Sequence, residues 1–259
     1  MVPFGYVRPS CVAEAIAASG PERRYLAGGQ SLLAALKLRL AAPETLVDIG
    51  RLPELQGIAV VDGALEVGAG CTHAEIAEGA AAIPALAALA GSIGDVQVRN
   101  MGTLGGALAN NDPAGDHAAA VLGLGADIRT DRRTIAADDF FTGMFETALE
   151  PGELVVRVAY PLPRRAAYAK VRNPASGYPV VGVFVADTAA GPRVAVTGAA
   201  VCPFRLAAFE QALADRFDPG ALAGLAVDGR DFNRDLHASA EYRAHLVGVL
   251  AARAVAAMV

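Results

Sequence analysis

Glycine is concentrated in one short stretch near the middle of the chain, where Gly102, Gly105 and Gly106 lie within five residues. Because glycine has no side chain, the main chain at such a place can approach a ligand closely and point its N–H groups toward it. Asp112 and Pro113 follow, and this pair predicts a helix N-cap with proline at the first helical position. The stretch therefore predicts a ligand-binding loop that leads into a helix.

Asp116 adds a carboxylate to this region, one helical turn after Asp112 and on the same predicted face. A carboxylate is a poor neighbour for phosphate. If the loop holds a nucleotide, we therefore expect Asp116 to accept hydrogen bonds from sugar or ribityl hydroxyl groups. The glycines are expected near the phosphate groups.

A second glycine pair, Gly28-Gly29, stands between a short apolar strand signal and a predicted helix over about 31–40. Leucines recur in that helix at helical spacing, at Leu32, Leu33, Leu36 and Leu40. Unpaired N–H groups in the first turn and the positive end of the helix dipole favour a diphosphate at such a position. Taken alone, the segment also fits an ordinary glycine turn before a leucine helix.

The two glycine segments match two motifs of one known family. The chain reads Ala-Gly-Gly-Gln-Ser-Leu at 27–32, and within 99–116 it reads Arg-Asn, Thr-Leu-Gly-Gly, Asp-Pro and a following Asp. In this order the motifs resemble the FAD-binding subunit of the molybdenum hydroxylases, the xanthine dehydrogenase and aerobic carbon monoxide dehydrogenase family. The resemblance extends to Tyr242-Arg243 near the end of the chain. Gln30 departs from the histidine of the carbon monoxide enzymes and Ala107 from a frequent polar residue, which leaves the substrate of the parent complex open.

The resemblance implies an α+β fold of the molybdopterin dehydrogenase (PCMH-like) type. Two α/β subdomains, at about 1–55 and 56–160, would enclose an extended FAD within a domain over 1–160. A small C-terminal domain over 161–259 would follow, with a three-stranded antiparallel sheet and helices. The proline-rich segment 161–165 is the expected linker.

Local patterns add three predictions within the first domain. Alternation around Asp62-Gly63 predicts a β-hairpin over 59–67. Thr72 and Glu75 form a capping-box pattern, which puts His73 in the first turn of a helix, where we expect it to be exposed and structural. Gly68-Ala69-Gly70 is not a Rossmann fingerprint, because His73 occupies the third glycine position.

The family resemblance also assigns cofactor contacts residue by residue. The first motif would wrap the diphosphate with Leu26, Ala27, Gly28, Gly29, Gln30, Ser31 and Leu32. The second would place Thr103, Leu104, Gly105, Gly106, Ala107, Asn110 and Asp116 around FAD. Val155 and Lys170 would reach the flavin, and Tyr178 would cover the isoalloxazine ring, where an aromatic side chain shields it from solvent.

Composition limits the other classes of function. Lys and Arg number 22 against 27 acidic residues, without the basic patch that nucleic-acid binding requires. No uncharged apolar run reaches the roughly 18 residues of a membrane span, and we expect a cytoplasmic protein. Cys11, Cys71 and Cys202 are far apart, so neither an iron–sulfur cluster nor another metal site is expected on this chain.

The chemistry that the resemblance implies is electron transfer through FAD. No catalytic acid, base or triad is expected, and the electron donor must lie on another chain. The implied partners are a two-iron, two-sulfur subunit and a large molybdopterin subunit, assembled as a dimer of heterotrimers. Reduced FAD would then pass electrons to NAD, a quinone or oxygen. A stand-alone FAD-dependent oxidase is the enzyme alternative, and a non-redox binding protein that has lost the cofactor is the third hypothesis.

Overall fold

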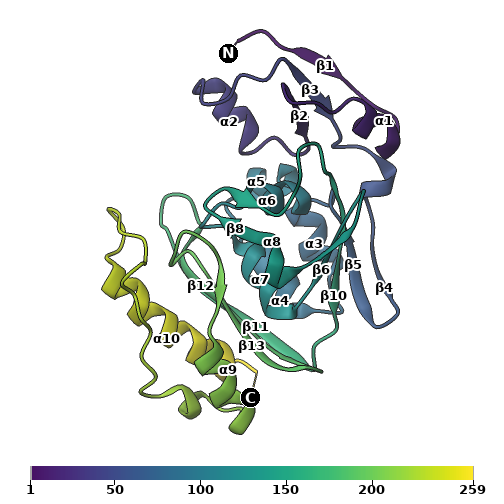
Figure 1. Cartoon of the computed structure of the whole chain (residues 1–259). Coiled ribbons are helices and arrows are strands. Elements are labelled where there is room, and N and C mark those ends of the chain that lie inside the picture. Colours follow the sequence, from purple (N-terminus) through teal and green to yellow (C-terminus); the bar gives the residue numbers. More distant parts are fainter. Residues whose placement is uncertain (1, 259) are drawn as a thin grey trace.

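The computed structural model describes residues 2–258, which form three parts stacked along one axis (Figure 1). The chain enters at one end of the molecule, and the C-terminal part lies at the other. Helices and strands are mixed in all three parts, which confirms the α+β prediction.

The N-terminal part is a small parallel sheet with two short helices. Its strands are β1 (Gly5–Val7), β3 (Thr45–Asp48) and β2 (Arg23–Leu26), in the order β1-β3-β2. Helix α1 (Val12–Ala17) connects β1 to β2, and α2 (Leu32–Lys37) connects β2 to β3. A short helical turn, η1 (Pro53–Leu55), leads out of this part, and its Leu55 belongs to the same small core as Ala15 and Val47.

The central part contains an antiparallel five-stranded sheet with helices beside it. The strand order is β4 (Ile58–Val61), β5 (Ala64–Gly68), β10 (Val155–Pro161), β6 (Asp127–Thr130) and β7 (Thr134–Ala136). The helices are α3 (His73–Gly79), α4 (Pro84–Gly91), α5 (Val96–Met101), α6 (Leu104–Asn110) and α7 (Asp116–Leu124). After β7 come the short α8 (Ala137–Phe140), β8 (Phe141–Gly143) and β9 (Glu146–Thr147).

The predicted β4–β5 hairpin is confirmed. Its turn residues Asp62 and Gly63 have φ angles of +46° and +79°. Positive φ at both central positions is the type I′ geometry that an Asp-Gly pair favours.

The C-terminal part is an antiparallel sheet covered by helices on both faces. Its strands β11 (Arg165–Arg172), β12 (Pro179–Thr188) and β13 (Gly191–Thr197) are joined by a two-residue β14 (Phe204–Arg205). Helices α4 and α7 contact it from the central part, and α9 (Ala207–Asp215) and α10 (Ala240–Ala256) contact it from the other side, with η2 (Pro219–Leu222) between them. The predicted three-stranded sheet was therefore one strand short, because two paired residues leave no alternation in the sequence.

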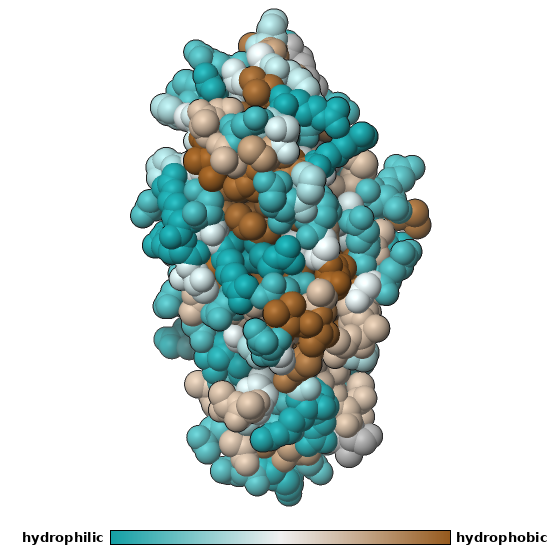
Figure 2. Space-filling model, turned by 90° about the vertical axis from the view of Figure 1, so that its right-hand side faces the viewer, coloured by the Kyte–Doolittle hydropathy of each residue, from teal (hydrophilic) through white to brown (hydrophobic). Residues whose placement is uncertain are grey.

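One hydrophobic core spans the central part and one face of the C-terminal sheet, and a second core lies between that sheet and the helices α9 and α10. Phe184 of β12 is fully buried with residues of α7, and a Cβ on Gly123 would lie 2.7 Å from its ring. Only residues 162–164 separate β10 from β11, so the predicted linker is short. On the face in Figure 2, hydrophobic residues gather near the junction of the N-terminal and central parts.

Two predictions about the glycine-rich stretch were wrong. It is not a loop, because α5 and α6 occupy most of it. The following helix starts at Asp116, not at Pro113. The carbonyl oxygen of Pro113 accepts hydrogen bonds from the backbone N–H of Gly198 at 2.8 Å and the hydroxyl of Thr197 at 3.1 Å, which occupy the acceptor that a helix starting there would use.

Within residues 2–258, none of the helices has the combination of length and hydrophobicity that crossing a membrane requires. Over the same residues, His, Cys, Asp and Glu side chains form no group of three or more that could hold a metal ion.

Candidate cofactor-binding site

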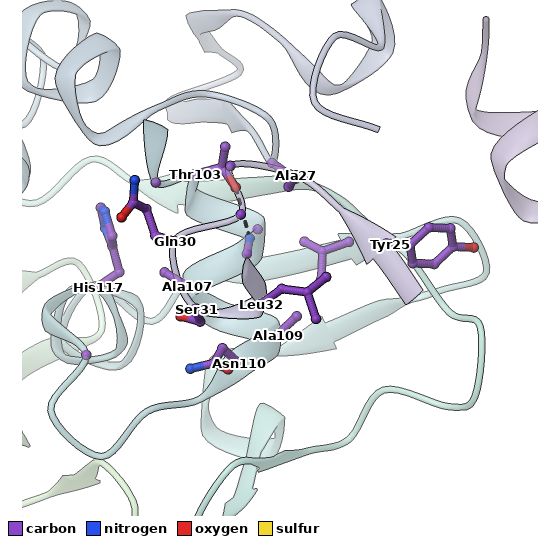
Figure 3. Close-up of a pocket in the computed structure, with 18 of the residues that line it drawn as sticks. Tyr25, Ala27, Gln30, Ser31, Leu32, Thr103, Ala107, Ala109, Asn110 and His117 are labelled. Carbon is purple, nitrogen blue, oxygen red and sulfur yellow. Dashed lines mark hydrogen bonds between the residues drawn. The ribbon is translucent and has the colours of Figure 1, made fainter. Parts of the chain in front are cut away.

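A cavity of about 450 Å³ lies between the segment that follows β2 and the helices of the central part (Figure 3). Tyr25 and His117 stand at opposite ends of the view. Most of the residues predicted to bind FAD line this cavity: Ala27, Gly28, Gly29, Gln30, Ser31, Leu32, Thr103, Gly105, Gly106, Ala107, Asn110, Asp116, Val155 and Tyr178. Leu26, Leu104 and Lys170 lie outside its lining. Segments far apart in the sequence thus converge on one cavity.

The two glycine motifs contact each other directly. A Cβ on Gly28 would lie 1.7 Å from the carbonyl oxygen of Met101 and 3.1 Å from the Cα of Gly102. Gly29 has a φ of +75°, a conformation that only glycine adopts without strain. The first motif therefore needs both of its glycines, one for close packing and one for the turn.

The first motif carries the free N–H groups. From Gly28 to Leu32, no backbone N–H has a hydrogen-bond partner among the described residues. Five such groups beside the start of α2 form an electropositive surface that suits a phosphate oxygen.

The N–H groups of the second motif are already used, contrary to the prediction that they point toward a ligand. Leu104 donates to the Cys71 carbonyl at 3.0 Å, Gly105 to the Ala69 carbonyl at 2.8 Å, and Gly106 to the Thr103 hydroxyl at 3.3 Å. A Cβ on Gly105 would also lie 2.7 Å from that of Ala69. Gly105 therefore allows α6 to pack tightly against the chain after β5 and form a wall of the cavity.

Asp116 forms a buried ion pair at the start of α7. Its Oδ1 accepts hydrogen bonds from the Lys170 Nζ at 2.7 Å and the Tyr168 hydroxyl at 2.9 Å. The Lys170 and Asp116 side chains are 5% and 0% exposed, and Lys170 also donates to the Ser92 carbonyl. Burial raises the pKa of Asp116, while Lys170 opposes the rise. Burial also raises the pKa of Tyr168 and lowers the pKa of Lys170.

The second carboxylate oxygen of Asp116, Oδ2, is buried and has no hydrogen-bond partner among residues 2–258.

Tyr168 was missed by the sequence analysis. It lies two residues before Lys170 in β11, so strand periodicity places both side chains on the same face and could have identified it.

His73 and His117 form a second buried polar contact on the cavity wall. His73 Nδ1 and His117 Nε2 are 3.1 Å apart, and the two residues are 5% and 1% exposed. Burial lowers the pKa of His73 to about 4 and that of His117 well below its ordinary value.

The capping box is confirmed, with Glu75 N–H donating to the Thr72 hydroxyl at 3.2 Å and Thr72 N–H to the Glu75 carboxylate at 2.7 Å.

The prediction of an exposed His73 was wrong. A capping box fixes where a helix starts, but it does not show which residues of the first turn are covered by other elements. The ring of His73 packs against Gly102, where a Cβ would lie 2.7 Å from Nε2.

Tyr178 forms a wall shared by two cavities. It lines the main cavity and also a second one of about 370 Å³, which is formed partly by Met144, Asn233 and Arg234. Burial raises the pKa of the Tyr178 hydroxyl, so the side chain is a neutral aromatic group at this boundary. This position is compatible with the predicted shielding of a planar ring.

Known proteins resemble this chain over nearly its full length. The family described as "FAD binding domain in molybdopterin dehydrogenase" matches residues 2–163. The carbon monoxide dehydrogenase medium chain of Hydrogenophaga pseudoflava is 34% identical over 98% of this chain and 97% of the relative. The nicotine 6-hydroxylase medium subunit of Paenarthrobacter nicotinovorans is 32% identical over 96% of this chain and 95% of the relative.

Solved structures show the same fold. A chain of carbon monoxide dehydrogenase from Hydrogenophaga pseudoflava, in a form that lacks the Mo-pyranopterin moiety of the molybdenum cofactor, is similar with a TM-score of 0.89 and 33% identity, over 100% of this chain and 98% of that one. A chain of quinoline 2-oxidoreductase from Pseudomonas putida 86 is similar with a TM-score of 0.88 and 28% identity, over 99% of this chain and 97% of that one.

Proposed function

Because the chain belongs to the family of FAD-binding domains in molybdopterin dehydrogenases, we propose that it is the FAD-binding medium subunit of a heterotrimeric molybdenum hydroxylase. Its function is electron transfer: it takes electrons from an iron–sulfur subunit and passes them to an external acceptor. The iron–sulfur clusters and the molybdopterin belong to partner subunits.

The observation that carries this proposal is the set of free N–H groups from Gly28 to Leu32 beside a cavity of about 450 Å³. A dinucleotide needs an anion site of this kind for its diphosphate and an elongated cavity for its two ends. FAD supplies the redox chemistry when bound, and the protein supplies binding, orientation and electrostatics. The buried Oδ2 of Asp116 is a further acceptor for a ribityl hydroxyl group.

All the sequence-predicted contacts remain part of this proposal. In it, Leu26 and Leu104 act by packing next to the two motifs, since neither lines the cavity. Lys170 acts through Asp116, whose charge it balances. Val155 lines the cavity and Tyr178 covers the flavin ring.

The partners in this proposal are a small iron–sulfur subunit and a large molybdopterin subunit. The named relatives are medium chains or medium subunits, which supports a multi-subunit assembly. We further propose that two heterotrimers pair, and that the complex is cytoplasmic. The mass of the native complex and fractionation of host cells check these two points.

A stand-alone FAD-dependent oxidase is the second candidate function. The similar proteins include medium chains of multi-subunit enzymes that match this chain from end to end, which favours the subunit over the oxidase. The discriminating property is co-purification with two other chains.

The test is a gentle purification from the native host, with a visible spectrum and the masses of all chains and cofactors. FAD together with an iron–sulfur chain and a large molybdenum chain is the expected result. A yellow protein without partners would favour the oxidase. A colourless, partner-free protein that does not bind added FAD would contradict both redox functions.

A further inference from the structure

The His73–His117 pair ends at the cavity. His73 Nδ1 contacts His117 Nε2, which leaves His73 Nε2 and His117 Nδ1 as the two outer nitrogens. His73 Nε2 lies against Gly102, at the start of the second glycine motif. His117 Nδ1 is buried and has no hydrogen-bond partner in the part of the chain that the structure describes.

Both imidazoles are neutral near pH 7, because burial lowers the pKa of His73 to about 4 and the pKa of His117 well below its ordinary value. A neutral imidazole has one N–H donor and one acceptor nitrogen. The contact between the rings therefore allows two arrangements. Either His73 donates to His117, which puts an N–H on His117 Nδ1, or His117 donates to His73, which puts an N–H on His73 Nε2.

The surroundings of His117 favour the second arrangement. In the first, an N–H donor would be buried at Nδ1 without a partner, and orphaned N–H groups are rarer in proteins than under-satisfied acceptors. His117 is also the second residue of α7, where the positive end of the helix dipole favours a lone pair over another N–H. In the second arrangement the outer N–H is on His73 Nε2, at the cavity wall.

We propose that His73 donates a hydrogen bond through Nε2 to an acceptor oxygen of bound FAD, and that His117 is the positioning residue that holds His73 in the required tautomer. This inference rests on the proposed function. The donor imidazole is neutral, so it orients the ligand by a directional hydrogen bond and places no full charge beside it. His73 Nε2 stands next to Gly102. Gly102 is in turn close to the first motif, because a Cβ on Gly28 would lie 3.1 Å from the Cα of Gly102. The donor therefore lies near the free N–H groups of the first motif.

Two acceptors in FAD have the required chemistry at such a place, a phosphate oxygen of the diphosphate and a hydroxyl oxygen of the ribityl chain. ADP distinguishes them, because it contains the diphosphate but lacks the ribityl chain. A substitution at His73 that lowers the affinity for FAD and for ADP equally indicates that the acceptor is a phosphate oxygen. A substitution that lowers only the affinity for FAD indicates that the acceptor is a hydroxyl oxygen of the ribityl chain.

The test uses two matched amide substitutions in the complete complex after its FAD has been removed. Glutamine places an N–H near the position of histidine Nε2, whereas asparagine places one near Nδ1. We expect His73→Gln to bind FAD within about threefold of the parent and His73→Asn to bind it about tenfold or more weakly, as loss of one hydrogen bond predicts. Calorimetric titration with FAD and with ADP measures both, and equal melting temperatures of the unliganded variants show that folding is retained.

The role of His117 is tested by a double-mutant cycle. His117→Leu alone is expected to weaken FAD binding, since His73 is then free to adopt either tautomer. In the His73→Asn background the same substitution is expected to have no further effect. FAD affinities of His73→Asn and His73→Gln that both equal the parent's would overturn the proposal, and additive losses in the cycle would overturn the positioning role of His117. A complex that binds no FAD even with both histidines intact would instead contradict the proposed function.

Discussion

The carbonyl oxygen of Met101 lies where a side chain on Gly28 would begin, because a Cβ built on Gly28 would be 1.7 Å from that oxygen. The two residues are far apart in the sequence, and each lies within one of the two motif segments. The free N–H groups of the first motif are thus held against the helices of the second by a contact that tolerates no side chain.

Gly28→Ala should therefore reduce FAD affinity by about tenfold or more, since the contact is with backbone and a methyl group must displace the segment. Titration of the FAD-free complex measures the loss. Gly248→Ala is the matched control: a Cβ there has no neighbour within 4 Å, and alanine is the better helix former in α10. If both alanine variants bound FAD like the parent, the close approach at Gly28 would have no functional importance.

Removing Lys170 should destabilise the chain strongly. Lys170→Met leaves the fully buried Asp116 carboxylate without its cation, and we expect the free energy of unfolding to fall by about 3–5 kcal/mol. Urea unfolding of the full chain measures this. Lys170→Met combined with Asp116→Asn should recover part of the loss, because the second change removes the unpaired charge. A double variant less stable than Lys170→Met would contradict this account.

Acidification should destabilise the chain through the histidine pair. His73 has a pKa of about 4 in the folded chain against 6.5 for an ordinary histidine, because burial disfavours its charged form. Between these values the unfolded state binds a proton that the folded state does not, so the free energy of unfolding falls as the pH drops from 6.5 to 4. His73 alone contributes about 3 kcal/mol over this window, and His117 adds to it.

Urea unfolding between pH 7 and pH 4.5 tests this dependence. His73→Gln should show a shallower decline than the parent, whereas His245→Gln, which replaces an exposed histidine, should decline like the parent. Parallel curves for His73→Gln and the parent would show that His73 is not held neutral by the fold.

Arg243 should be essential to the C-terminal part. Arg243 is 3% exposed, and its guanidinium donates to the Val180 carbonyl, to the Gly198 carbonyl at 2.9 Å and to the Asp235 carboxylate at 2.6 Å. Arg243→Met leaves these acceptors without their donors, and we expect a loss of about 2–4 kcal/mol in urea unfolding. The same change at the exposed Arg253 of α10 should cost less than about 0.5 kcal/mol.

The sequence predicted features that a few neighbouring residues determine. The turn at Asp62-Gly63 and the capping box of Thr72 and Glu75 are local, and both were found where expected. The convergence of both glycine motifs on one cavity was expected only from the family resemblance, because no local pattern relates segments so far apart.

The predictions that were wrong, at Pro113 and His73, depend on contacts between elements that are far apart in the sequence. Pro113 does not start a helix because Thr197, at the end of β13, and the following Gly198 donate hydrogen bonds to its carbonyl oxygen, and nothing near Pro113 in the sequence indicates this. The ring of His73 packs against Gly102 and forms a hydrogen bond with His117, and both partners are far from His73 in the sequence. These contacts form only when the tertiary structure does.

The family match ends at residue 163, but the ion pair between Asp116 and Lys170 crosses that boundary. Recombination between relatives at this point would separate a buried carboxylate from its counter-ion. An incoming C-terminal segment would have to supply a lysine at the same place in its first strand to restore the charge balance, and a tyrosine two residues earlier to restore the second hydrogen bond to the carboxylate. The region that matches the family model therefore depends on β11 for the neutralisation of its buried carboxylate, and exchange of the first part alone is expected to yield chains that fold poorly.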